Sequence, residues 1–267
     1  MRPGQVDQGV VVRVLVAAVV AAAALSGCAG HRGDDTPRVG TQIQRSIPPE
    51  VGRLLFVGSN GTVTSLSSLR GSTIVLADFL TLCQEICPLT TAELGHVQQD
   101  IRRAGLAGHV VIMEVTVDPA RDTRARLAAY QTLVGAGANW RLLTGSAIDV
   151  AALWRWFGVA YERQPEAFPP AIDWWTGRKL TYDVGHTDVL FVIDPAGTER
   201  YVVTGPAKTP PASVPTPLAG FLSVEGRANL SSPSVDAWNA SDVDALLTRV
   251  TGHAPALWLA AVQHRSP

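Results

Sequence analysis

Two kinds of hydrophobic pattern alternate along the middle of the chain. Residues 72–80 and 109–117 are nearly continuous apolar runs rich in β-branched side chains, with the length of strands buried on both faces of a sheet. Residues 88–104, between them, place apolar side chains at near-helical intervals. The order of these segments predicts a strand, a helix and a second strand, which form a βαβ unit.

The alternation continues towards the carboxyl end. Further helices are predicted near residues 123–133, with Asp122 and Thr123 as caps, at 147–156, and at 242–251, where Ser241 begins the helix. Further strands are predicted at 140–143, 189–194 and 198–203, the last two joined by a turn at 195–197. The pattern therefore predicts an α/β fold with a central mixed β-sheet, helices on both faces and an added β-hairpin.

Outside this series the chain is more polar. Residues 54–64 alternate around the turn Gly58 to Gly61, which predicts another hairpin. The preceding polar residues predict a flexible tether at 28–50, so that the folded domain spans 51–267. The segment 205–217 holds five prolines and continues as a polar stretch to about residue 240. We expect this Pro-rich segment to be a solvated insertion or a lid.

The amino end has the pattern of an export signal. Arg2 and Arg13 precede an apolar run over residues 14–25, which is short for a membrane span of about twenty apolar residues. The following Ser26, Gly27 and Cys28 complete a sequence that resembles the bacterial lipobox. The resemblance implies cleavage after residue 27 and lipidation of Cys28, and hence a lipid-anchored protein on the extracytoplasmic face of the membrane. A plain signal peptide or signal anchor with an incidental cysteine is the alternative.

Composition excludes several classes of protein. Of 267 residues, 46% are hydrophobic, and 22 Lys and Arg balance 23 Asp and Glu, so the chain is foldable and carries no positive surplus for nucleic acid. The three cysteines are too few for a disulfide-dense scaffold. If Cys28 carries a lipid, one pair of cysteines remains for cysteine chemistry in the folded domain.

That pair, Cys83 and Cys87, lies where a central strand ends and a helix begins, the usual position of sites in open α/β sheets. Residues four apart share one face of a helix, so the two sulfurs can form a disulfide or share a metal. An inert disulfide staple is an alternative, but a bridge over so short a loop gives little entropic stabilisation. Asp118 and Asp122 could suggest acid/base catalysis, yet Pro119 and the expected helix favour turn and cap roles.

Three motifs resemble the Sco/SenC family in order and spacing. They are Cys83-Gln84-Glu85-Ile86-Cys87-Pro88, the run from Val117 to Thr123, and Tyr182-Asp183-Val184-Gly185-His186 followed by Phe191 to Gly197. This resemblance covers about residues 54–203. It implies a thioredoxin-like fold and membrane-tethered copper delivery to the CuA centre of cytochrome c oxidase. The family usually has Pro-Asp where this chain has Gln84-Glu85.

The resemblance also implies that Cys83, Cys87 and His186 bind copper, as Cu(I) or Cu(II). The chemistry agrees, because soft thiolates suit Cu(I) and imidazole suits either oxidation state. The implied partners are the copper-bearing oxidase subunit and a thiol reductant protein that keeps the pair reduced. A thiol–disulfide oxidoreductase is the second candidate, although the three-residue spacing and the distant histidine favour a metal-binding protein over an enzyme. We expect the other histidines to be surface or packing residues.

Overall fold

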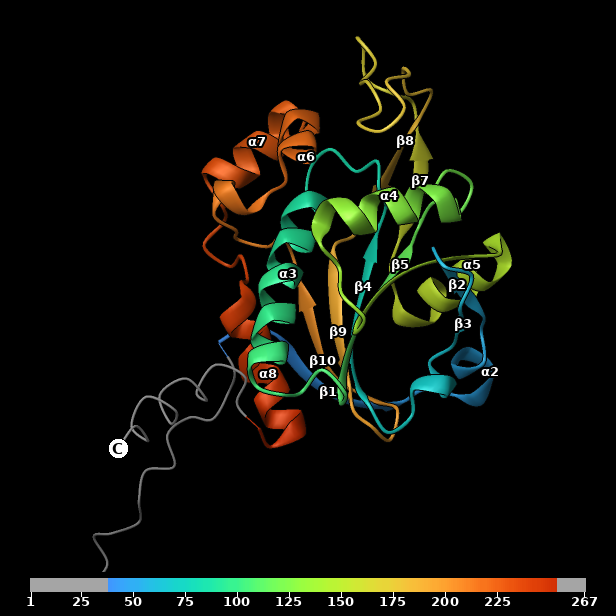
Figure 1. Cartoon of the computed structure of the whole chain (residues 1–267), viewed down its shortest axis with the longest axis vertical. Helices are drawn as coiled ribbons and strands as arrows, with labels where there is room; N and C mark the ends of the chain where they lie inside the picture. Colours follow the sequence, from blue (N-terminus) through green and yellow to red (C-terminus); the bar gives the residue numbers. More distant parts are fainter. Residues whose placement is uncertain (1–37, 254–267) are drawn as a thin grey trace, which may run out of the picture. The chain divides into compact units, whose positions relative to one another are not determined.

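The computed structural model describes residues 38–253, and its main sheet has eight strands in the order β1-β10-β9-β4-β5-β6-β2-β3 (Figure 1). The strands are β1 (Thr41–Ser46), β2 (Phe56–Gly58), β3 (Val63–Thr64), β4 (Thr73–Phe79), β5 (Val110–Thr116), β6 (Trp140–Gly145), β9 (Val189–Ile193) and β10 (Thr198–Thr204). The helices are α2 (Pro49–Gly52), α3 (Cys87–Arg103), α4 (Arg124–Val134), α5 (Ala147–Phe157), α6 (Thr216–Phe221), α7 (Val224–Ser231) and α8 (Ala240–Thr251). Short 3₁₀ turns cover Ser67–Leu69 and Pro211–Ser213. A second sheet pairs β7 (Tyr161–Gln164) with β8 (Asp183–His186).

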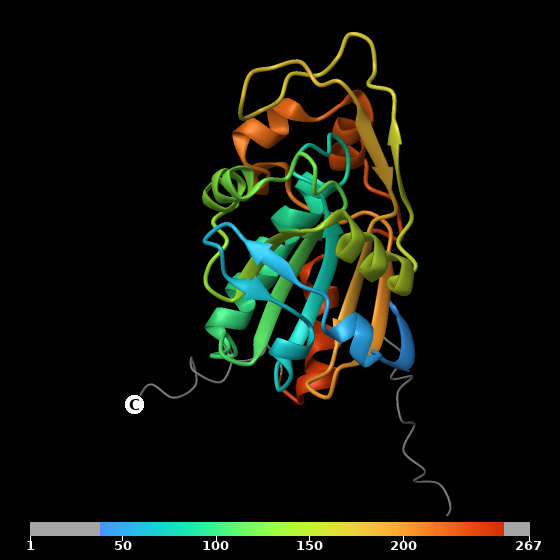
Figure 2. The same ribbon diagram turned by 90° about the vertical axis from the view of Figure 1, so that its right-hand side faces the viewer.

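The predicted mixed sheet is confirmed. Strand β4 runs parallel to β5 and antiparallel to β9, and every residue of β4 and β5 is buried. Helices α3 and α8 pack against one face of the sheet, and α5 lies on the opposite face (Figure 2). Because helices cover both faces, these central strands read as continuous apolar runs rather than as alternating ones.

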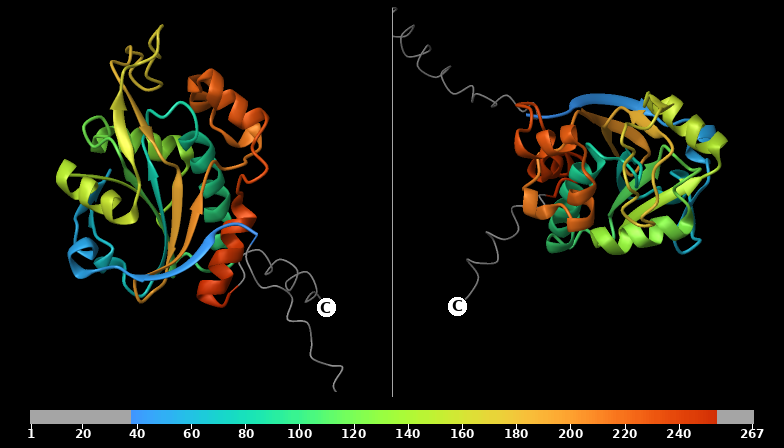
Figure 3. Two further views of the ribbon diagram at one scale, coloured as in Figure 1. Left: turned by 180° about the vertical axis from the view of Figure 1, so that it is seen from behind. Right: turned by 90° about the horizontal axis from the view of Figure 1, so that it is seen from above.

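Sheet order brings three distant segments to one edge. Leu190 near the start of β9 pairs with Ala77 near the end of β4, and also with Val203 near the end of β10. Strand β9 is antiparallel to both neighbours. The segments that follow β4, precede β9 and follow β10 therefore lie at the same end of the strands (Figure 3). The two cysteines, His186 and the Pro-rich segment therefore converge there.

Three local predictions need correction. Part of the expected tether is strand β1, which pairs with β10, and residues 28–37 lie outside the described residues. Helix α8 begins at Ala240 with Asn239 as its N-cap in a capping box, so Ser241 is not the cap. Thr123 alone caps α4 with its side chain, because the Asp122 carboxylate is buried elsewhere. The signal segment and Cys28 also lie outside the described residues.

The Pro-rich segment is folded onto the body of the domain, which corrects the expectation of a solvated insertion. It contains α6 and α7, and Leu218, Phe221 and Trp238 are buried. The Trp238 Nε1–H donates to the Gly205 carbonyl at 2.9 Å, tying the two ends of the segment together. No helix between residues 38 and 253 is long and apolar enough to cross a bilayer.

Candidate metal centre

Cys83 lies in the loop after β4, and Cys87 is the first residue of α3. Both thiols are free and buried, with exposed fractions of 7% and 1%. The Cys87 backbone N–H donates to Cys83 Sγ at 3.3 Å, so the first turn of the helix turns one of its unpaired amides towards the sulfur. The structure thus confirms that the two sulfurs lie together at a helix start.

His186 joins them from the end of β8. Its Nε2 lies 3.2 Å from Cys87 Sγ, and the ligand atoms of Cys83, Cys87 and His186 all lie within 4.8 Å of one another. The imidazole side chain is only 3% exposed. Pairing of His186 with Tyr161 places it on a strand, which restricts where the ring can point. Within residues 38–253 this is the only group of three such ligands.

Asp78 belongs to the site and was missed from the sequence. Its Oδ2 lies 2.5 Å from His186 Nδ1, and its Oδ1 accepts a hydrogen bond from the Val189 N–H at 3.0 Å. An acceptor at Nδ1 keeps a proton there, so Nε2 is the nitrogen that faces the sulfurs and that binds a metal when the ring is neutral. The available signal was a lone carboxylate inside the apolar run of β4, because such a buried charge needs a partner.

The two thiols differ electrostatically. Hydrogen bonding from Cys87 and the neighbouring His186 lower the pKa of Cys83, while burial raises the pKa of Cys87. Burial alone would lower the pKa of His186, but its hydrogen bond with Asp78 and its interaction with Cys83 outweigh burial and raise that pKa. Cys83 is therefore the thiolate of the pair, held next to the imidazole.

A second buried carboxyl group borders Cys87. Asp188 accepts a hydrogen bond from Thr90 Oγ1 at 2.9 Å, and burial together with the charge of Asp78 raises its pKa to about 8. At neutral pH this group is mostly protonated. Asp188 therefore adds little negative charge beside the imidazole.

The β7–β8 hairpin borders a surface cavity. The cavity has a volume of about 380 Å³ and is lined by residues of β7 and β8, including His186. Gly185, which precedes His186 in the chain, packs closely on the Gln164 side chain. A Cβ at Gly185 would lie 2.5 Å from Gln164 Nε2. The β7–β8 hairpin therefore separates the imidazole, which is 3% exposed, from this cavity.

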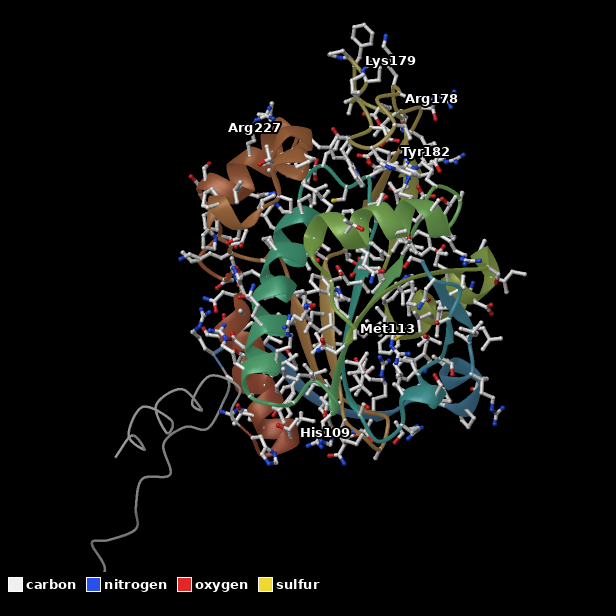
Figure 4. All side chains as sticks on the ribbon, viewed as in Figure 1. His109, Met113, Arg178, Lys179, Tyr182 and Arg227 are labelled. Carbon is white, nitrogen blue, oxygen red and sulfur yellow. The ribbon has the colours of Figure 1, made fainter. Side chains whose placement is uncertain are left out.

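The connection between β7 and β8 is anchored beside the site. Trp174 Nε1–H donates to the Thr81 carbonyl at 2.7 Å, and Asp173 forms a buried ion pair with Arg126. In Figure 4 Arg178 and Lys179 project farther from the sheet than Tyr182. Trp154 is fully buried in the core, and Trp174 flanks the site.

Asp118 and Asp122 hold this region together. Asp118 forms an ion pair with Arg121 and accepts a hydrogen bond from the Tyr182 hydroxyl, and its carbonyl accepts the Asp122 N–H of a turn. Asp122 is not a cap: it accepts hydrogen bonds from Thr81 and Thr116, and burial raises its pKa to about 6. Both carboxylates are structural in this arrangement.

The other described histidines lie outside the site. His96 interacts with Glu93 and Ser213, His253 with Thr251, and His109 is exposed. Their surface and packing roles agree with expectation.

Comparisons with known proteins agree with this picture. Residues 45–216 match the SCO1/SenC family. The chain is 28% identical over 191 residues to the mitochondrial SCO2 homolog of Bos taurus, covering 69% of this chain and 65% of that protein. It is 33% identical over 108 residues to the SCO1 homolog of Bacillus subtilis, covering 40% of this chain and 54% of that protein. Among solved structures, apo Sco1 of Thermus thermophilus is 22% identical with a TM-score of 0.49, covering 63% of this chain and 87% of that one.

The fold and the site define a thioredoxin-like protein with a potential metal centre of two thiols and one imidazole. The family match spans more than half of the chain. The chain therefore belongs to the SCO1/SenC family.

Proposed function

We propose that the protein binds copper through Cys83, Cys87 and His186. The observation that carries the proposal is the convergence of two buried sulfurs and one imidazole nitrogen within 4.8 Å. Thiolates are soft ligands that select Cu(I), and imidazole also suits Cu(II). Three donors leave a coordination position for a second protein's ligand, so the bound ion can be handed on.

We further propose delivery of this copper to the copper-bearing subunit of cytochrome c oxidase. Family membership supports this partner, because BsSco, a solved relative 20% identical to this chain, is described as a member of the Sco family of cytochrome c oxidase assembly proteins. The lipobox-like sequence ending at Cys28 supports a lipid anchor on the extracytoplasmic face. A thiol reductant protein would keep Cys83 and Cys87 ready for loading.

Copper titration tests the first step. The reduced protein should bind one Cu(I) in competition with a chromogenic chelator, and the protein oxidised to a Cys83–Cys87 disulfide should not, because its sulfurs are no longer thiolates. Equal binding by both forms would exclude the thiols as ligands. For the second step, loaded protein is mixed with the purified copper-binding domain of the oxidase subunit, and copper retained entirely by the donor would refute delivery.

A thiol–disulfide oxidoreductase is the second candidate function. Its support is the lowered pKa of Cys83 beside the buried Cys87, an arrangement in which one thiolate attacks and the other resolves. An exchange assay with a disulfide-bonded partner protein distinguishes the two. Rapid turnover without stoichiometric copper binding would favour the enzyme.

A further inference from the structure

Helices α6 and α7 lie against the loop that joins the two cysteines. Almost all of this region follows the family match, which ends at residue 216. Leu218, Phe221 and Leu222 are buried, so this helix pair is packed onto the domain rather than suspended from it. The views of Figures 1 and 3 agree that α6 and α7 border the chain between β4 and α3.

The contact begins at Ser223, the N-cap of α7. Its backbone N–H donates to the Gln84 carbonyl at 2.9 Å, while its side chain caps the helix by accepting the Gly226 N–H at 3.0 Å. The Gln84 carbonyl belongs to the same peptide group as the Glu85 N–H, which is among the groups that lower the pKa of Cys83. In a trans peptide these two groups point in opposite directions, so fixing the carbonyl also aims the N–H at the sulfur.

One turn later, Gly226 allows the helix to approach the loop closely. A Cβ at this position would overlap the Gln84 carbonyl oxygen and lie 3.0 Å from Glu85 Cα. Backbone atoms cannot swing aside as the end of a flexible side chain can. By contrast, a Cβ on Gly220 of α6 would meet nothing within 4 Å.

The loop itself has few other restraints. Gln84, Glu85 and Ile86 are only half-buried, and the Gln84 side chain makes a single long hydrogen bond, 3.5 Å to Glu166. Segments with few buried contacts open easily. The Ile86 carbonyl accepts the Leu89 and Thr90 N–H groups of α3, so contact with α7 is a main restraint on the Gln84–Glu85 part of the loop.

We propose that Ser223 and Gly226 are positioning residues of the metal centre. Through them α7 acts as a clamp on the Gln84–Glu85 peptide, which keeps Cys83 shielded from solvent and its sulfur directed towards Cys87 and His186. The predicted effect of the clamp on copper affinity rests on the proposed copper function. Its effect on the exposure of Cys83 is independent of copper. The clamp is supplied by a part of this chain beyond the matched family region.

The test compares Gly226→Ala with Gly220→Ala in the purified, reduced protein. In Gly226→Ala the added methyl group must separate α7 from the loop, so Cys83 should be alkylated by iodoacetamide several times faster. Cu(I) affinity should fall by about tenfold, the low end of effects seen when the support of a metal ligand is lost. Gly220→Ala should match the wild type. Peptide mass spectrometry locates the modified cysteine, and the thiolate-to-Cu(II) absorption band should shift only in Gly226→Ala.

A second pair of variants covers the case in which Gly226→Ala does not fold. Ser223 has φ of −65°, which proline tolerates, so Ser223→Pro removes the N–H donor to Gln84 along with the side-chain cap. Ser223→Ala removes only the cap. Faster alkylation of Cys83 in Ser223→Pro than in Ser223→Ala supports the clamp.

Two results overturn separate claims. If Gly226→Ala and Ser223→Pro match their controls in alkylation rate while the wild type binds Cu(I), the clamp is refuted and the copper function stands. If the reduced wild type takes up no Cu(I) while Gly226→Ala still speeds alkylation, the clamp stands and the copper function fails.

Discussion

The Nδ1 atom of His186 lies 2.5 Å from Oδ2 of Asp78, although 108 residues separate them in the chain. Asp78 also receives the Val189 N–H, so a single buried carboxylate orients the imidazole and binds the start of β9. Antiparallel pairing of β4 with β9 makes this contact possible. The carboxylate thereby fixes the orientation of the ring, with Nε2 towards the sulfurs, and a metal ion binds there in place of a proton.

Asp78→Asn should weaken copper binding. His186 and Val189 bond to different oxygens of the carboxylate, so in the variant an NH₂ group must face one of them. It then either favours the wrong imidazole tautomer or opposes a backbone N–H. We expect about 10- to 100-fold lower Cu(II) affinity, the usual cost of losing such a support.

Competition titration measures this loss. Asp149→Asn, on α5 and outside the site, is the matched control and should bind copper as the wild type does. An Asp78→Asn protein with unchanged Cu(II) affinity would show that the carboxylate serves only to hold β9.

His186→Ala should separate the two oxidation states of copper. Two soft thiolates remain for Cu(I), whereas stable Cu(II) binding depends more on nitrogen and should be lost or strongly weakened. Cys83 and Cys87 should still form their disulfide. Titrations with each ion, beside the exposed-surface control His109→Ala, check the prediction, and equal affinity in both variants would remove His186 from the site.

The two cysteines should react unequally. The pKa of Cys83 is lowered below its usual value and that of Cys87 is raised, so the thiolate of Cys83 persists at lower pH. Cys87→Ser should therefore leave a thiol that iodoacetamide modifies below pH 8, and Cys83→Ser should leave one that reacts slowly. Rates followed by intact mass over pH 5 to 9 test this, and the reverse order would contradict it.

Glu114→Gln should flatten the dependence of stability on pH. Burial on β5 raises the pKa of Glu114 to about 7, although Trp140 Nε1–H and Thr91 Oγ1–H donate to its oxygens. Between the unfolded pKa and about 7 the folded protein holds a proton that the unfolded chain has lost, so stability falls as pH rises. At pH 8 the buried charge costs on the order of 3 kcal/mol.

Urea unfolding of the metal-free protein at pH 5 and pH 8 measures the effect. The variant should lose less stability than the wild type between these values, by roughly 2 to 3 kcal/mol. Glu162→Gln, at an exposed position, should behave like the wild type. Identical slopes in all three proteins would show that Glu114 does not titrate in this range.

Cys28→Ala should block lipidation and cleavage at that residue. The prediction rests on the lipobox-like sequence before Cys28, in which the thiol carries the lipid. The variant should persist as an unprocessed precursor or appear without lipid. Mass spectrometry of the mature amino end decides, and an unmodified terminus beyond Cys28 in the native protein would contradict the anchor.

Local pattern alone determined most of the elements. The continuous β-branched apolar runs of β4 and β5 and the 3.6-residue spacing of α3 are local signals, which depend only on near neighbours in the chain. The position of Cys83 and Cys87 at a strand end and helix start followed for the same reason. His186 was identified through family resemblance, because a single histidine has no local signature.

Tertiary structure decided which distant residues share the site. The sheet order places the start of β9 and the end of β10 beside the end of β4, and only this order brings Asp78 to His186 and α7 to Gln84. Asp122 illustrates the same limit, since its sequence context matches a helix cap while its partners, Thr81 and Thr116, come from other strand ends. Such contacts depend on loop closure over many residues and on burial, and neither is encoded in a short window of sequence.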